Sequence, residues 1–84
     1  MKEAYIGIPS LTEAQHASEL LRQERIGNAV IRMPALPGKR GCAFGLRLWE
    51  IDLDNALAHL KKHGFRIGRI LVRDGRGMLQ ERKA

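Results

Sequence analysis

The sequence predicts one α+β domain whose elements follow in the order strand, helix, strand, strand, helix, strand. Short apolar runs predict the strands, two segments with apolar residues at helical spacing predict the helices, and prolines and glycines separate them. With 84 residues, of which 44% are hydrophobic and 29% charged, the chain has the composition of a folded protein and the length of one domain. We expect this domain to occupy residues 1–73 and residues 74–84 to form a loose polar C-terminal tail.

The first helix has a clear start signal. An apolar run at residues 4–8, typical of a short buried strand, ends at Pro9. Ser10 then opens a capping box, in which its hydroxyl oxygen accepts from the amide of Glu13 and the Glu13 carboxylate reaches back. Leucine and alanine residues at helical spacing predict a helix over about residues 11–25.

The middle of the chain predicts two strands joined by a long hairpin loop. Gly27 is the expected stop of the first helix, and residues 28–33 alternate as a second strand. Residues 34–41 contain two prolines and two glycines and cannot continue a ladder. Apolar side chains alternate again from Cys42 to Leu48, which predicts the third strand.

The last part of the chain predicts a second helix and a fourth strand. Asp52 is the expected N-cap of a helix that ends near Gly64, and residues 65–72 form the fourth strand. Two helices on one face of a four-stranded antiparallel sheet make the ferredoxin-like arrangement, with the expected strand order 4-1-3-2. This order places the end of the first strand beside the hairpin turn, so Cys42 is expected near Ser10.

Cys42 is the single cysteine and the candidate for covalent chemistry. A thiolate is the reactive form of cysteine, and it needs positive potential to form at neutral pH. That potential is expected from the start of the first helix, from the hairpin cations and from a glycine that lets the backbone approach a bound group; these residues are Ser10, Leu11, Thr12, Lys39, Arg40 and Gly41. The alternative is a buried core cysteine, because Cys42 has the same strand parity as Phe44 and Leu46.

His59 and His63 are spaced i,i+4 on the second helix, a spacing that can chelate a metal when further ligands approach. The alternative is two exposed histidines near a helix C-terminus, where positive charge is favourable. We expect no metal and no cofactor. A lone cysteine cannot form an internal disulfide, and the chain shows neither a signal peptide nor a membrane-spanning run, so we expect a cytoplasmic protein that does not enter a membrane.

The net charge of +6 favours contact with nucleic acid or acidic partners, although the basic residues are spread along the chain. RNA recognition by such a sheet uses exposed aromatic rings. Tyr5 is the aromatic expected on the open face, together with Arg32 and Arg47, whereas Trp49 is expected to pack at the entrance of the second helix. A homodimer through the open face is also expected, with these candidate residues: Tyr5, Gly7, Val30, Ala43, Gly45 and Ile70 or its neighbours.

Several short sequence features follow one another in a recognisable order. They are Ile8-Pro9-Ser10, the alanine-containing helix from Ala14 to Leu21, Met33-Pro34 to Pro37, Arg40 and Cys42. This order resembles that of a family of short bacterial selenium/sulfur carrier-like proteins. The resemblance spans about residues 4–72, with one departure: the family's cysteine is followed by glycine, whereas Ala43 follows Cys42 here.

The resemblance implies a protein that carries sulfur or selenium on Cys42, as a persulfide or selenopersulfide, between a donor and an acceptor protein. Such a carrier takes part stoichiometrically and need not be an enzyme. The alternative function is a noncatalytic basic binding or regulatory module, expected to be dimeric through its open face, with a nucleic acid or a protein as its partner.

Overall fold

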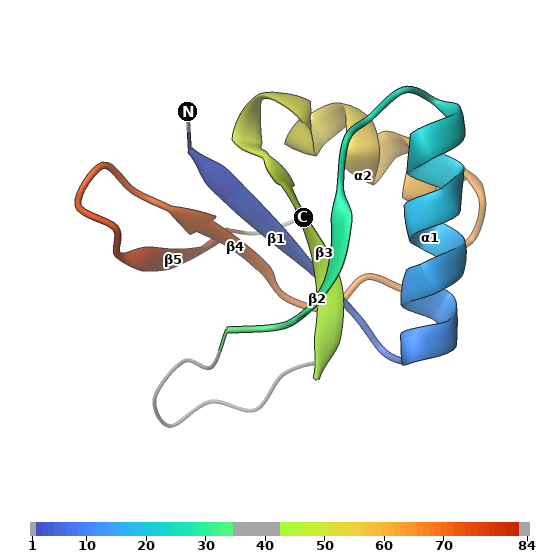
Figure 1. Cartoon of the computed structure of the whole chain (residues 1–84), viewed down its shortest axis with the longest axis horizontal. Helices are drawn as coiled ribbons and strands as arrows, with labels where there is room; N and C mark the ends of the chain where they lie inside the picture. The colour runs from blue at the N-terminus through green and yellow to red at the C-terminus, as the bar shows by residue number, and fades with distance from the viewer. Residues whose placement is uncertain (1, 35–42, 83–84) are drawn as a thin grey trace.

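The structure is a computed structural model that describes residues 2–34 and 43–82. Within these residues the chain forms five strands and two α-helices, the second helix preceded by a 3₁₀ turn (Figure 1). In chain order the elements are β1 (Glu3–Ile8), α1 (Leu11–Gln23), β2 (Ala29–Arg32), β3 (Phe44–Trp49), η1 (Glu50–Asp52), α2 (Leu53–Lys62), β4 (Ile70–Arg73) and β5 (Leu79–Arg82).

The strands form one antiparallel sheet in the order β2-β3-β1-β4-β5. Both helices lie on the same face of this sheet (Figure 1). The prediction of an α+β domain with two helices and an antiparallel sheet is therefore confirmed. The predicted four-stranded order 4-1-3-2 is not what is observed, because a fifth strand lies beyond β4.

The fifth strand comes from the segment expected to be a loose tail. β5 pairs with β4, and the turn between them is organised by Asp74. The Asp74 Oδ1 atom accepts from the amides of Arg76 at 2.8 Å and Met78 at 3.0 Å, and the Asp74 amide donates to the Met78 carbonyl at 2.8 Å. These bonds close a tight turn and bring Leu79–Arg82, which is polar apart from Leu79, back along the sheet edge.

The fourth predicted strand is shorter than expected, because β4 begins only at Ile70. The chain just before it still follows β1: the Gly68 amide donates to the Gly7 carbonyl at 2.7 Å, and the Gly7 amide donates to the Arg69 carbonyl at 2.7 Å. The backbone around residues 68–69 is therefore tied to the sheet without belonging to a regular strand.

The core lies between the sheet and the two helices. Alternate residues of β1 and β3 point toward the helices, as the apolar alternation predicts. Val30 and Ile70 also face the helices, because they pair with the core residues Leu46 and Ile6. The expectation that Val30 lies on the open face is therefore wrong, and of Ile70 and its neighbours it is Leu71, the partner of Tyr5, that lies there. The largest fully buried apolar side chains of this core are Ile6, Ile8, Leu21, Leu46, Leu53, Leu60 and Ile70.

The first helix ends before its predicted stop, Gly27. It ends at Gln23, and the residue that takes the left-handed conformation is Arg25, with φ of 61°. The Ile26 amide donates to the Leu21 carbonyl at 2.8 Å, which is the long bond of a Schellman motif. Burial of both Ile26 and Leu21 supplies the hydrophobic contact that accompanies this motif.

The second helix ends with the same motif and a different residue. Gly64 takes the left-handed position with φ of 77°, and the Phe65 amide donates to the Leu60 carbonyl at 3.0 Å. At the other end of α2, Asp52 is the N-cap as expected, but its side chain makes no capping hydrogen bond because η1 leads directly into the helix.

Candidate functional site

The expected thiol site is at the edge where β1 ends and β3 begins. Phe44, the first residue of β3, pairs with Ile8 at the end of β1 and with Arg32 at the end of β2. One further backbone bond, from the Met33 amide to the Ala43 carbonyl at 2.8 Å, extends the hairpin toward its loop. The loop itself lies outside the described residues, and with it the predicted site residues Lys39, Arg40, Gly41 and Cys42.

The start of α1 follows this edge after a two-residue connection. The Ser10 Oγ atom accepts from the Glu13 amide at 3.1 Å, as the capping box predicts. The Glu13 carboxylate does not complete the box, because its Oε1 atom accepts from Arg66 Nη2 at 3.0 Å. Among the described residues the amides of Leu11 and Thr12 have no acceptor, so the first turn of α1 keeps unpaired N–H groups that favour an anion.

Arg32 supplies a positive charge at the base of the hairpin. Its guanidinium carbon lies 5.6 Å from the centre of the Phe44 ring, and within the described part of the chain it forms no ion pair. Arg32 points to the helix side of the sheet and Arg47 to the other side, so the expectation that the two share the open face is wrong. Sequence reasoning missed Arg32 as a rim cation because it assigned the residue to the wrong face.

The face opposite the helices carries a charged cluster around Tyr5. Arg73 Nη2 donates to Tyr5 Oη at 3.1 Å, and the guanidinium carbon lies 5.7 Å from the ring centre. The hydrogen bond to Tyr5 is the largest cause that raises the pKa of Arg73. Glu3 Oε2 lies 3.6 Å from Arg47 Nε, and Glu3 Oε1 lies 3.9 Å from Arg73 Nε. Tyr5 was expected to be the aromatic residue that stacks on a base. It is only 5% exposed, so its ring is not available for stacking.

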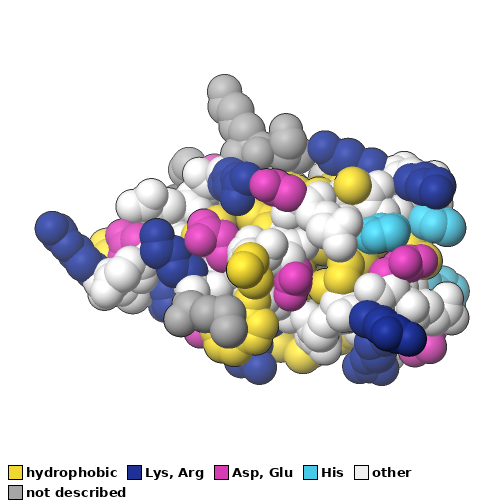
Figure 2. All heavy atoms as spheres, turned by 90° about the horizontal axis from the view of Figure 1, so that it is seen from above, with side chains coloured by type: hydrophobic (Ala, Val, Ile, Leu, Met, Phe, Trp, Pro, Cys, Tyr) yellow, Lys and Arg dark blue, Asp and Glu magenta, His cyan; other side chains and the backbone are white. Residues whose placement is uncertain are grey.

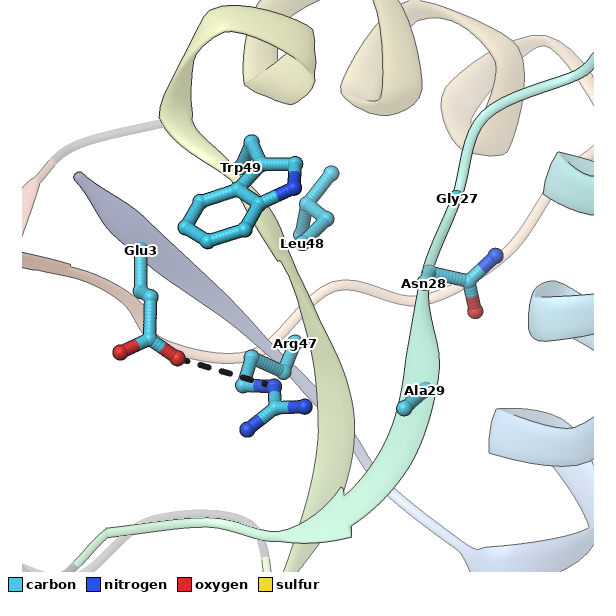
Figure 3. Close-up of a pocket in the computed structure, with 7 residues that line it drawn as sticks. All are labelled: Glu3, Gly27, Asn28, Ala29, Arg47, Leu48 and Trp49. Carbon is cyan, nitrogen blue, oxygen red and sulfur yellow. Dashed lines mark ion pairs between the residues drawn. The ribbon is translucent and has the colours of Figure 1, made fainter. Parts of the chain in front are cut away.

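Trp49 is the exposed aromatic residue of this face instead. It is 45% exposed and lies at the mouth of a hollow of about 380 Å³ (Figure 3). The expectation that Trp49 is a packing residue at the entrance of α2 is therefore wrong. The parity of β3 places Trp49 on the same face as Arg47, and this alternation was the sequence signal that could have indicated its exposure. The hollow is lined by Glu3, Gly27, Asn28, Ala29, Arg47, Leu48 and Trp49.

The two histidines spaced for a metal lie in a different environment. His59 Nε2 lies 3.9 Å from Glu24 Oε2, so its nearest charged partner is at the end of α1. Across residues 2–34 and 43–82, no three histidine, cysteine or acidic side chains come together as metal ligands. Figure 2 shows the histidines at the helical side of the molecule, with acidic and basic side chains interspersed over the visible surface.

None of the described helices is long and apolar enough to cross a membrane. No protein-family model, curated protein or solved structure matches the chain.

Proposed function

We propose that the domain is a ferredoxin-like carrier of sulfur or selenium, in which Cys42 accepts the transferred atom. One observation carries the proposal: Phe44, where the Cys42 hairpin enters β3, pairs with Ile8 at the end of β1, and β1 leads into α1. Ala43 is the one residue between Cys42 and Phe44, the first residue of β3, and in this proposal the thiol reaches the unpaired amides of Leu11 and Thr12.

The chemistry is a transfer between sulfur atoms. The Cys42 thiolate attacks the outer sulfur of a donor persulfide, a new S–S bond forms, and the donor cysteine leaves as a thiolate. The acceptor's thiolate then attacks the outer sulfur on Cys42 in the same way, and Cys42 is released as a thiolate. Each step exchanges one thiolate for another with no net oxidation, and a donor perselenide transfers selenium by the same route.

The surrounding charges have a defined role in this proposal. Positive potential lowers the pKa of a thiol and increases the fraction of thiolate at neutral pH. The first turn of α1 and Arg32 supply it from the described residues, and Lys39 and Arg40 are the proposed contributors from the hairpin loop.

Alkylation of the folded protein by iodoacetamide at pH 6.5 tests the proposal. Cys42 should react several times faster than a free thiol of ordinary pKa, about 8.5. Arg32→Gln should slow the reaction by about two- to fivefold through the loss of one nearby charge. Arg76→Gln is the matched control, because Arg76 is an exposed arginine in the β4–β5 turn, and it should leave the rate unchanged.

Intact-mass spectrometry provides the second readout. Protein purified without reductant, or incubated with a persulfide donor, should gain the mass of one sulfur atom, and Cys42→Ser should not. Alkylation no faster than that of a free thiol, together with no sulfur adduct, would overturn the carrier and favour the noncatalytic binding role.

A further inference from the structure

The hollow beside Trp49 exists because the chain leaves the sheet just before β2. The pairing of β2 with β3 ends at Ala29 and Arg47, and Gly27 and Asn28 diverge from β3 (Figure 3). Asn28 turns its side chain toward α1, where Oδ1 accepts from Ser18 Oγ at 2.6 Å. This bond to a buried serine holds the segment away from the end of β3, so the hollow is built into the fold.

An unpaired backbone amide is expected at the wall of the hollow. The bond from the Met33 amide to the Ala43 carbonyl identifies a hydrogen-bonded pair of the antiparallel ladder. Such pairs alternate along a ladder, so Trp49 is in a position to bond across to Gly27. The structure shows no backbone bond between these two described residues, which leaves the Trp49 amide available to a ligand.

Arg47 supplies the positive charge of the hollow. Its side chain is 53% exposed and Glu3 Oε2 lies 3.6 Å from Nε. Among the described residues no hydrogen bond from its guanidinium is present, so the terminal nitrogens are open to a ligand. Arg47 and Trp49 are alternate residues of β3 and project from the same face (Figure 3). A guanidinium with free terminal nitrogens can bind two oxygens of one anion.

We propose that this hollow binds a nucleotide unit, with the base against the indole of Trp49 and the phosphate on the guanidinium of Arg47. An exposed indole stacks on any base, and arginine is well suited to phosphate. The volume of about 380 Å³ suits a ligand of this size. The unit can be a free nucleotide or part of a single strand, since the two present the same chemistry. This site is independent of Cys42 and of sulfur transfer.

The experiment uses the fluorescence of Trp49, which is the only tryptophan of the chain and therefore reports directly on the hollow. The probes are AMP, oligoadenylates of increasing length, adenosine and inorganic phosphate. Saturable quenching by AMP that exceeds the effect of adenosine or phosphate is the expected result. Arg47→Gln should weaken AMP binding by about tenfold, the loss of one charge-assisted contact, while Arg76→Gln should have no effect.

Gly27→Val is a second variant that fills the hollow and keeps Arg47. A Cβ atom at Gly27 has no neighbour within 4 Å, so the variant should fold, and it should also weaken AMP binding. Equal affinity for AMP and for oligoadenylates assigns the site to free nucleotides. Affinity that rises with length, with a salt dependence that Arg47→Gln reduces, assigns it to a single strand.

Three outcomes would overturn the proposal. They are the absence of saturable quenching by AMP and by the oligoadenylates, quenching by adenosine equal to that by AMP, and AMP binding that both Arg47→Gln and Gly27→Val leave unchanged.

Discussion

The two faces of the sheet bury apolar side chains in different ways. On the helix side, fully buried residues such as Ile6 and Leu46 pack beneath α1 and α2. On the opposite face, Leu71 is 1% exposed although no helix covers it, and two arginines, Arg69 just before β4 and Arg73 at its end, flank it in the chain. Burial on the first face depends on apolar volume, whereas on the second it depends on charged side chains held in particular positions. The second face is therefore the one on which a few substitutions can change binding and leave the fold intact.

Leu46→Ala should give the largest effect, because it opens a cavity beneath the helices. We expect a loss of about 2–5 kcal/mol in the free energy of unfolding, measured by urea denaturation. Ile31→Ala is the matched control on the opposite face, where the side chain is only half-buried, and it should cost about 1 kcal/mol. Equal losses at the two positions would show that the two faces of the sheet contribute equally to the free energy of unfolding.

Gly45→Ala should be the most damaging small change on the open face. A Cβ atom there would overlap the backbone carbonyl of Ile6 and lie 2.5 Å from Met33 Sδ. Because the carbonyl belongs to the neighbouring strand, we expect a cost of about 1–3 kcal/mol. Gly75→Ala is the control, since a Cβ atom at Gly75 meets nothing within 4 Å. A stable Gly45→Ala protein would mean that β1 and β3 can separate locally.

Tyr5→Phe tests the polar cover of the open face. It removes the oxygen that accepts from Arg73, and the expected cost is about 0.5–1.5 kcal/mol. A double-mutant cycle with Arg73→Gln should show coupling, because the two side chains form one contact. Additive effects would show that the tyrosine ring is buried without help from the arginine.

The smallest expected effect is a dependence on pH at the edge of this face. The amides of Arg76 and Met78 lower the pKa of Asp74, so its carboxylate stabilises the folded state at neutral pH. This contribution should disappear as the pH falls below about 4, the ordinary value for aspartate. Asp74→Asn should therefore flatten the acid side of the stability profile and speed amide exchange in β5. An unchanged acid profile would show that the turn does not depend on the charge of Asp74.

The helices were more predictable than the strands because their signals are local. The Ser10 cap and the spacing of the apolar residues fix α1 without reference to the rest of the chain. Strand faces depend on the register with neighbours, and the apolar run of β2 has suitable residues on both sides, so Val30 was assigned to the wrong face. β5 was missed because one apolar residue, Leu79, gives no alternation, and its pairing arises from the turn at Asp74.

The candidate site was predictable only in outline. The meeting of the β1 end with the base of the hairpin follows from the order of the elements, and the structure has it. The burial of Tyr5 and the exposure of Trp49 do not follow from the order of the elements. They depend on Arg73 of β4 contacting Tyr5 and on Asn28 holding its segment away from β3. Both are contacts between residues far apart in sequence or on different elements.

A comparison of the two helix ends shows that the end of α1 can be made more stable. Arg25 occupies a backbone conformation that disfavours every side chain, by about 1 kcal/mol for an ordinary residue. The end of α2 shows that glycine fits the same motif in this fold. Arg25→Gly is thus a ready compensating background, in which otherwise fragile variants of the hollow or of the sheet can be purified and compared.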